Sequence, residues 1–439
     1  MTAAQKHILQ WLTEAFPEKL DGPRHAGPED EFIVVNDRGE LGDTTPLFHD
    51  LIDDGWRPKH DPVTKALVGA SMGELEVGMD VGPGTLELGF THVANLMEHL
   101  PIRATVLKIV DLHLGRHGLH RLLDYSAQPV TQPIPQHWGP KGRSQFFREY
   151  FPRDVDVQTA SAASQVHIDV TRDELIPTLE MLLSLSPILT ALTANAPVWG
   201  GQLDPKGLLA SRQDFWNRFT LETGHWSNVH VGPAKARPPY TEQAPSSLEE
   251  LASWISQTPF IVHVDNDRIV SPQMPFHSWY GIEKETGISE TAMRASYLSH
   301  EGTLWWEIRP RVAYGTIEVR PCCQSKYTVN VDALVLGLVE NGKVALEFAR
   351  KTKLYSGWRA LHRACLKDGL RFPGVQDIAR EVLKIAYEGL KQRGFGEEQL
   401  LSVLTIPIET MSSPGHKKKR IFENHGIEAL VEHLLSKDS

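Results

Sequence analysis

The sequence has few cysteines, no long apolar run and no excess of positive charge, and each shortage disfavours a class of protein. Its three cysteines, Cys322, Cys323 and Cys365, lack the spacing of a zinc site or of a disulfide framework. Residues 1–16 have the pattern of an amphipathic helix rather than of an export signal. No apolar run approaches the ~20 residues of a membrane span. We therefore expect a cytoplasmic protein with no membrane partner.

Acidic residues outnumber basic ones, which bears on the expected partners. Lys and Arg number 45 against 55 Asp and Glu, so the formal net charge is −10 at pH 7. This balance argues against nucleic acid as a partner and leaves small polar molecules open. The chain of 439 residues, 41% of them hydrophobic, is long enough for a large core. It contains no phosphate-binding loop, dinucleotide-binding glycine motif or kinase motif set.

Strand-like and helix-like segments follow one another without regular alternation. The clearest strand patterns lie at 27–35, 85–90, 161–170, 304–310 and 315–321. Long helical patterns lie at about 93–117, after residue 171, and from about residue 329 to the end. The proline-rich segment 232–250 reads as a surface loop. This order predicts an α+β fold for residues 1–439, taken as a single domain with helices on one face of a sheet.

The expected strands place charged side chains on one face and apolar side chains on the other. Because successive side chains of a strand point to opposite faces, Glu318 and Arg320 share one face while Val319 lies on the core face. Neighbouring strands add acidic and imidazole side chains by the same alternation: Glu29, Glu31, Glu87 and His167. Asp80 lies seven residues before Glu87, across a Gly-Pro-Gly turn. A solvated outer face explains any one such strand. The recurrence of glutamate, where Thr, Lys, Ser or Gln are usual, favours a site instead.

Carboxylates that converge on one face disfavour each other's ionisation unless a cation lies among them. Hard divalent cations prefer oxygen ligands, so Mg²⁺ fits, and a single imidazole also suits Mn²⁺. Arg309 and Arg320 match an anion that arrives with the metal, because a guanidinium fork fits phosphate. Metal ions, carboxylates and arginines together are typical of a site for the phosphates of a nucleotide such as ATP.

Two further clusters read as surface features. The run His416–Arg420, HKKKR, is typical of the solvated start of a helix. His113, His117 and His120 lie three or four residues apart, but their segment has no carboxylate at ligand spacing. We therefore expect both clusters to face solvent.

Six segments between Gly27 and Gln324 carry a resemblance to a known family. In order they read GPEDEF, DVGPGTLELGF, PKGRSQFFREYF, TASAASQVHID, NAPVWGGQLDPKGLLASRQDFW and WWEIRPRVAYGTIEVRPCCQ. This series resembles the type 2 glutamate-cysteine ligases, carboxylate-amine ligases whose fold is related to glutamine synthetase. The resemblance implies a curved, mostly antiparallel sheet that forms a funnel-shaped active site. It also implies ATP and Mg²⁺ as cofactors, small-molecule substrates, and a monomer or homodimer.

Positions within these motifs imply roles for individual residues. One Mg²⁺ would have as ligands Glu31, Asp80 and Glu87, and a second would have Glu29, His167 and Glu318. The arginines that would face the phosphates as catalytic groups are Arg309 and Arg320. The residues that fall in motifs lining the substrate region are Arg143, Gln165 and Arg212.

The resemblance implies that ATP converts a carboxylate, typically the γ-carboxylate of glutamate, to an acyl phosphate, from which an amine then displaces phosphate. Cysteine is the expected amine, as in glutathione biosynthesis. The same chemistry on another amine or acid is an alternative. A phosphotransferase on the same fold and a silent binding protein are two further classes. The presence of all six candidate metal ligands argues against the silent protein.

Overall fold

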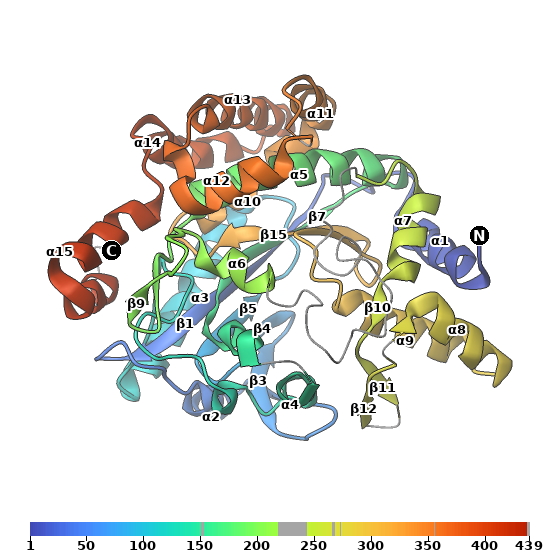
Figure 1. Cartoon of the computed structure of the whole chain (residues 1–439), viewed down its shortest axis with the longest axis horizontal. Helices are drawn as coiled ribbons and strands as arrows, with labels where there is room; N and C mark the ends of the chain where they lie inside the picture. The colour runs from blue at the N-terminus through green and yellow to red at the C-terminus, as the bar shows by residue number, and fades with distance from the viewer. Residues whose placement is uncertain (151–152, 218–243, 266–267, 273, 355, 437–439) are drawn as a thin grey trace.

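The computed structural model describes residues 1–150, 153–217, 244–265, 268–272, 274–354 and 356–436 (Figure 1). Its main strands are β1 (Ala26–Asn36), β2 (Arg57–His60), β3 (Leu67–Met72), β4 (Leu75–Met79), β5 (Thr85–Gly89), β6 (Leu119–Arg121), β7 (Ala163–Asp169), β14 (Ile308–Arg311) and β15 (Thr316–Cys323). Short two-stranded pairs are formed by β8 (Val198–Trp199) with β9 (Gln202–Leu203), β10 (Pro259–Phe260) with β13 (Met274–Pro275), and β11 (His263–Asp265) with β12 (Arg268–Val270).

Helices occupy most of the remaining described residues. In the first half they are α1 (Ala3–Ala15), α2 (Thr45–Asp53), α3 (Leu96–Arg116), α4 (Gly142–Tyr150), α5 (Arg172–Thr193) and α6 (Ser211–Asn217). In the second half they are α7 (Leu248–Gln257), α8 (Phe276–Glu285), α9 (Glu290–Gly302), α10 (Thr328–Glu340), α11 (Gly342–Lys351), α12 (Trp358–Asp368), α13 (Val375–Arg393), α14 (Thr405–Glu409) and α15 (Pro414–Leu435). The 3₁₀ helices include η1 (Pro135–His137) and η2 (Arg153–Ala160).

The main strands form one nine-stranded sheet with the order β14-β15-β7-β1-β5-β4-β3-β2, and β6 pairs with β1. Every pairing in this sheet is antiparallel. The order brings β1, near the N-terminus, beside β7 and close to β15, which lies some 290 residues further on. The predicted α+β class with a mostly antiparallel sheet is thereby confirmed.

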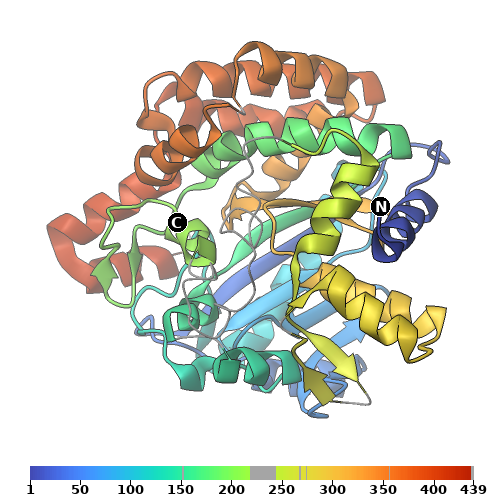
Figure 2. The same cartoon turned by 45° about the vertical axis from the view of Figure 1, so that its right-hand side comes forward.

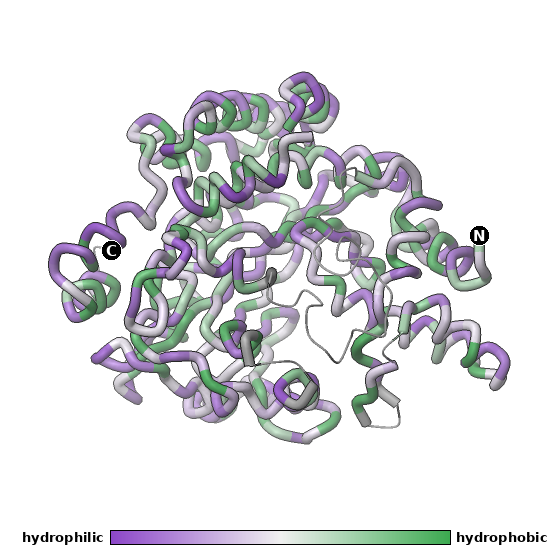
Figure 3. Tube along the Cα trace, viewed as in Figure 1, coloured by the Kyte–Doolittle hydropathy of each residue, from purple (hydrophilic) through white to green (hydrophobic). Residues whose placement is uncertain are grey.

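The helices cover the apolar face of the central strands. Ile317 and Val319 of β15 are fully buried in the same core as Leu182 of α5 and Leu334 of α10. Figure 1 shows α5 and helices α10 to α14 gathered on one side of the sheet, and Figure 2 shows the same layer from another side. The outer helix α13 buries residues at a spacing of three or four, and hydrophobic and hydrophilic segments alternate along it in Figure 3. The opposite face of β1, β5, β7 and β15 is left for the charged side chains.

Two local expectations are corrected. Residues 232–243 of the expected loop lie outside the described residues, but the end of that segment starts α7. Ser247 caps this helix by accepting from Glu250 N, and acidic residues occupy its first turn, which are ordinary signals for a helix start. Helix α5 meets the length and composition of a membrane span, although no such run was expected. Within its most apolar window, however, 83% of the residues are buried inside the protein, which is how a core helix behaves.

The two clusters expected to face solvent are partly buried. Lys418 of α15 is 2% exposed and its Nζ pairs with the carboxylate of Asp124, which is also buried. His113 is 1% exposed, and Asp50 and Asp54 contact its two ring nitrogens at 3.2 and 3.0 Å. Both expectations were wrong for the same physical reason. The acidic partners of Lys418 and His113 come from parts of the chain that are distant in sequence, and the pattern of residues along one helix does not reveal them.

Candidate active site

A cavity of about 500 Å³ opens on the charged face of the sheet. Its wall is built from strands β1, β5, β7, β14 and β15, together with the segments that precede α4 and β7. All the predicted site residues except Arg212 line it: Glu29, Glu31, Asp80, Glu87, Arg143, Gln165, His167, Arg309, Glu318 and Arg320. The alternation of side chains along the strands has therefore collected residues that are as far as 291 positions apart, from Glu29 to Arg320.

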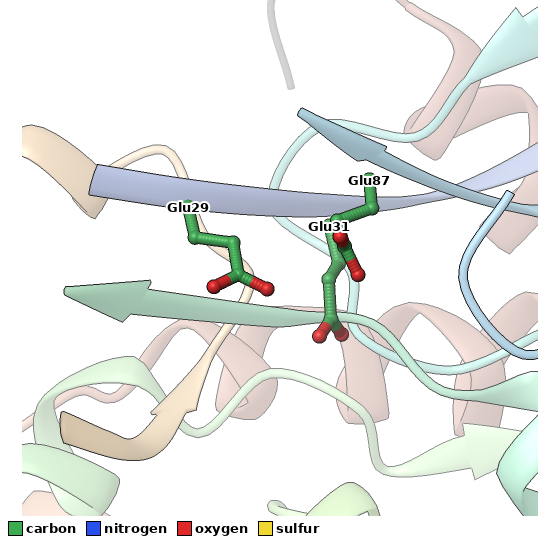
Figure 4. Close-up of side chains that lie close together, drawn as sticks. All are labelled: Glu29, Glu31 and Glu87. Carbon is green, nitrogen blue, oxygen red and sulfur yellow. The ribbon is translucent and has the colours of Figure 1, made fainter. Parts of the chain in front are cut away.

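Three glutamates form the first carboxylate group of the cavity. Strand pairing sets Glu31 opposite Glu87, and Glu29 lies two residues from Glu31 on the same face of β1. One ligand oxygen of each side chain lies within 4.8 Å of the others (Figure 4). Asp80 lies just before β5 and close enough for its charge to act on Glu31 and Glu87. The family resemblance implies that Glu29 belongs to the second metal position, and Glu29 lies close both to Glu31 and Glu87 and to His167.

The electrostatics of this group fit a bound cation. Burial, followed by repulsion from Asp80, raises the pKa of Glu31 to about 8. Burial, with repulsion from Glu29 and Asp80, raises the pKa of Glu87 well above its usual range. Buried carboxylates in this state are satisfied either by protons or by a cation. Because the donor atoms are carboxylate oxygens, the residues present fit Mg²⁺.

A second group lies beside the first, around His167. His167 Nε2 is 3.7 Å from Glu29 Oε2 and 3.9 Å from Glu318 Oε2. The pairing of β7 with β15 sets Glu318 directly opposite His167. The other ring nitrogen, Nδ1, lies 2.9 Å from Thr316 Oγ1. The imidazole is therefore held with Nε2 toward the two carboxylates, an arrangement that fits a second metal ion.

Glu318 is surrounded by three arginines. Arg309 binds it bidentately, with Nε 2.8 Å from Oε2 and Nη2 2.9 Å from Oε1. Arg311 Nη1 also donates to Oε2, and Arg320 Nη1 donates to Oε1. Burial opposes ionisation, but the arginines, with Arg309 first, hold the pKa of Glu318 well below its usual range. Arg309 Nη1 donates in addition to Leu304 O, at 2.9 Å, so Arg309 anchors Glu318 while Arg311 and Arg320 flank it.

Gln165 links the carboxylates to the arginines, and Arg212 lies behind this link. Gln165 Nε2 donates to Glu31 Oε1, and Gln165 Oε1 accepts from Arg320 Nη1. Arg212 is 1% exposed and does not line the cavity. Its Nη1 donates to Arg320 O at 3.0 Å, and its charge lowers the pKa of Glu31. The resemblance implied a place in the substrate region, whereas the structure puts Arg212 beneath the wall in a supporting position.

Comparison with known proteins agrees with this geometry. A model described as "Glutamate-cysteine ligase family 2" matches residues 69–341, more than half of the chain. The chain belongs to this family. The chloroplastic glutamate–cysteine ligase of Nicotiana tabacum is 24% identical over 322 residues, a match covering 67% of this chain and 57% of the relative. The corresponding ligase of Medicago truncatula is 23% identical over 425 residues, covering 90% and 78%. The family-2 chain thus spans little more than half the length of the tobacco relative.

Solved structures share the fold of this family-2 chain at low identity. A bifunctional glutathione synthetase from Pasteurella multocida has a TM-score of 0.54 and 12% identity, covering 98% of this chain and 52% of that one. A glutamate–cysteine ligase from Francisella tularensis, solved in complex with AMP, has a TM-score of 0.53 and 10% identity, covering 95% and 88%. At these identities the likeness establishes the fold alone.

The cavity of the family-2 chain also contains residues that sequence reasoning missed. Arg311 follows Arg309 at a spacing of two, so strand alternation alone would have found it. Lys141 lines the wall; burial lowers its pKa, and attraction to Glu87 opposes that effect. Three of the aromatic wall residues pack together: the ring centroids of Trp138 and Phe147 are 6.0 Å apart, and those of Phe147 and Trp305 are 5.3 Å apart. No periodic signal marked these aromatic residues as wall rather than core.

Proposed function

We propose that this protein is an ATP- and Mg²⁺-dependent ligase that joins a carboxylic acid to an amine. The γ-carboxylate of glutamate and the amine of cysteine are the proposed pair, and a different acid or amine is the alternative. The observation that carries the proposal is that Glu29 lies close both to the first carboxylate group and to the second group around His167. The second group includes Glu318, which Arg311 and Arg320 contact. Membership of glutamate-cysteine ligase family 2 supports the same reaction.

The proposed roles follow from these positions. One Mg²⁺ would be held by Glu31, Asp80 and Glu87, and a second by Glu29, His167 and Glu318. Bound Mg²⁺ would neutralise the charge of the phosphates. Arg311 and Arg320 would contact phosphoryl oxygens, because both lie beside Glu318 in the cavity wall and their side chains are 17% and 11% exposed. Arg309, 5% exposed and bidentate on Glu318, would orient that carboxylate rather than the substrate.

The proposed reaction has two steps. The γ-phosphoryl group passes from ATP to a carboxylate oxygen, giving an acyl phosphate and ADP. The amine nitrogen then attacks the acyl carbon, phosphate leaves, and the nitrogen loses a proton to give the amide. Water would compete with the amine, so the site must exclude it. Trp138, Phe147 and Trp305 supply an apolar wall suited to that task.

We also propose a cytoplasmic location, supported by three buried cysteines without disulfides, which suit a reducing compartment. The assignment of residues 1–439 to one domain and the oligomeric state, monomer or homodimer, stay predictions.

The test is ADP release by the purified protein with Mg²⁺-ATP and glutamate, with and without cysteine and a panel of other amines. Product masses are read at the same time. A mass equal to glutamate plus amine minus water supports the proposal and identifies the amine. ADP release with a stable phosphorylated acid, independent of amine, would instead indicate a phosphotransferase. Glu87→Gln should abolish the release, whereas Glu98→Gln, on the exposed side of α3, is the matched control and should not.

A further inference from the structure

The amide of Gln158 has no hydrogen-bond partner among the residues that the structure describes. Gln158 lies in η2, is 1% exposed, and lines the cavity. Within this part of the chain neither its Oε1 nor its Nε2 forms a hydrogen bond. Buried polar groups are nearly always paired, and leaving both ends of an amide unpaired destabilises a protein. An amide that the fold leaves unpaired in a cavity wall is therefore available to a ligand.

Backbone groups on both sides of the Gln158 amide take part in hydrogen bonds, so the segment is held without this side chain. Ser161 Oγ donates to Gln158 O at 3.1 Å, and Gln128 N donates to Ala160 O at 2.8 Å. Nearby, Trp138 Nε1 donates to Asp156 Oδ1 at 2.7 Å. The segment is thus fixed by its own contacts, and the side chain of Gln158 is not needed to hold it. A rigid support of this kind preorganises a recognition group.

The position of Gln158 along the cavity indicates which part of the reaction it serves. Strand β7 begins at Ala163, whose N donates to Glu31 Oε2 at 2.6 Å, and reaches the second group at His167. The neighbouring Thr159 lies against Gly82, in the turn that follows Asp80, so Gln158 lies at the end of the cavity near the first carboxylate group. Under the proposed function the nucleotide lies toward His167 and the acid and amine toward Gln158.

We propose that Gln158 binds the α-amino and α-carboxylate groups of an amino-acid substrate, an inference that rests on the proposed function. Nε2 would donate to a carboxylate oxygen, and Oε1 would accept from the amino group. A primary amide offers one donor and one acceptor side by side, and an amino acid presents the complementary pair. Phosphate offers acceptors only and matches half of the amide. The amino acid is either the acid donor or the amine acceptor.

The test uses the full-length protein with Gln158 replaced by Met, of similar size and without the amide, and by Glu, which keeps an acceptor. For Gln158→Met we expect kcat/KM for one amino-acid substrate to fall about 10- to 100-fold. The KM for ATP should stay unchanged, and the melting temperature of the free protein should not fall, because an unpaired buried amide has been removed. Gln158→Glu should bind the same substrate more weakly still, since its charge repels the carboxylate.

Gln128→Met is the matched control. Gln128 is also 1% exposed but does not line the cavity, and its Oε1 accepts from Val130 N at 2.6 Å and Thr131 N at 2.9 Å. We expect this variant to melt at a lower temperature with unchanged KM values. The opposite patterns at the two glutamines separate recognition from a structural role.

The result also identifies the source of the amino acid, because KM is measured separately for glutamate and for cysteine. Unchanged kcat/KM values for both amino acids in Gln158→Met would overturn the inference while leaving the ligase intact. A rise confined to the KM of ATP would place the adenine at Gln158 and overturn it too. If the wild type ligates no acid to any amine, the proposed function fails, and the melting temperature is then compared with each free amino acid. Stabilisation of the wild type that Gln158→Met loses would still support the inference, and its absence would overturn it.

Discussion

The imidazole of His167 is held by Thr316 on the neighbouring strand, with Nδ1 2.9 Å from Oγ1. When Nδ1 carries the proton and donates to this hydroxyl, the lone pair of Nε2 is directed toward Glu29 and Glu318. That tautomer is the one a metal ion needs. Thr316 lies on the same face of β15 as Glu318, so one strand supplies both a ligand and the residue that orients another ligand.

Thr316→Val removes the hydroxyl and preserves the shape of the side chain. We expect the apparent affinity for Mg²⁺ or Mn²⁺ to fall about 10-fold. Loss of a residue that orients a metal ligand typically lowers the affinity by about 10- to 100-fold, and this is the lower end of that range. Metal-activation curves of ADP release and calorimetric titration with Mn²⁺ measure this change. Thr316→Ser keeps the oxygen and should restore most of the affinity. Equal affinity in the Val and Ser variants would show that the hydroxyl does not orient His167.

Glu318→Gln should lower the stability of the protein. Its charge is the shared partner of Arg309, Arg311 and Arg320, and it is 1% exposed. Breaking a buried ion pair from one side commonly costs about 3–5 kcal/mol, because the other charge stays buried without compensation. Urea unfolding in the presence of EDTA measures the change. An unaltered unfolding midpoint would mean that the arginines find other partners.

Glu87→Gln should leave the stability in EDTA unchanged or raise it, although it also removes a glutamate from the same cavity. Burial and like charges raise the pKa of Glu87 well above its usual range, so the metal-free fold favours the protonated side chain, which resembles an amide. The two variants should both lack ATP turnover, yet shift the urea midpoint differently. A large loss of stability in Glu87→Gln would contradict the repulsion inferred among Glu29, Glu31 and Glu87.

Strand alternation was enough to predict most of the site, because it fixes which face a side chain occupies. Glu31, Gln165 and Glu318 reached the cavity on that rule. Alternation does not say which strands are neighbours, and the pairing of Glu31 with Glu87 and of His167 with Glu318 came only from the sheet order. The family resemblance grouped these residues by the metal ion they would share, but it gave no strand order.

The misplaced residues share a different cause. Arg212 follows no strand pattern. Its buried guanidinium donates to Arg320 O, which is 108 residues away. Lys418 was expected in solvent because its run is charged, but Asp124, 294 residues away, provides a buried partner. Gln158 carries no local signal at all, since an unpaired amide is recognised only once every neighbour is known. Contacts of this range lie beyond what composition and periodicity encode.

The Lys418–Asp124 pair yields a stability prediction remote from the cavity. Lys418→Met should lower the free energy of unfolding by about 3 kcal/mol, because it leaves Asp124 buried without its counter-charge. Adding Asp124→Asn should recover part of this loss, and Asn tolerates the left-handed backbone there, where φ is +64°. KM values should not change. Lys417→Met, at an exposed position, is the control and should be neutral.

Binding of Mg²⁺ should stabilise the protein more as the pH rises toward 8. The pKa of Glu31 is raised from 4.5 to about 8 in the metal-free fold. Between these two pH values the folded state therefore holds a proton that the unfolded state has lost. Stability of the metal-free protein therefore falls as the pH increases, by up to about 1.4 kcal/mol per pH unit for one proton. Bound Mg²⁺ replaces that proton and removes the loss.

Melting temperatures in Mg²⁺ and in EDTA, compared across this pH window, measure the effect. Their difference should widen with pH for the wild type, whereas in Glu31→Gln it should be smaller and should vary less with pH, because the titrating carboxylate is gone. Taking the difference at each pH cancels groups that titrate equally with and without the metal ion. A difference that stayed constant but above zero in the wild type would mean that Glu31 is already ionised without a cation, and no difference at any pH would mean that these carboxylates do not hold a metal ion.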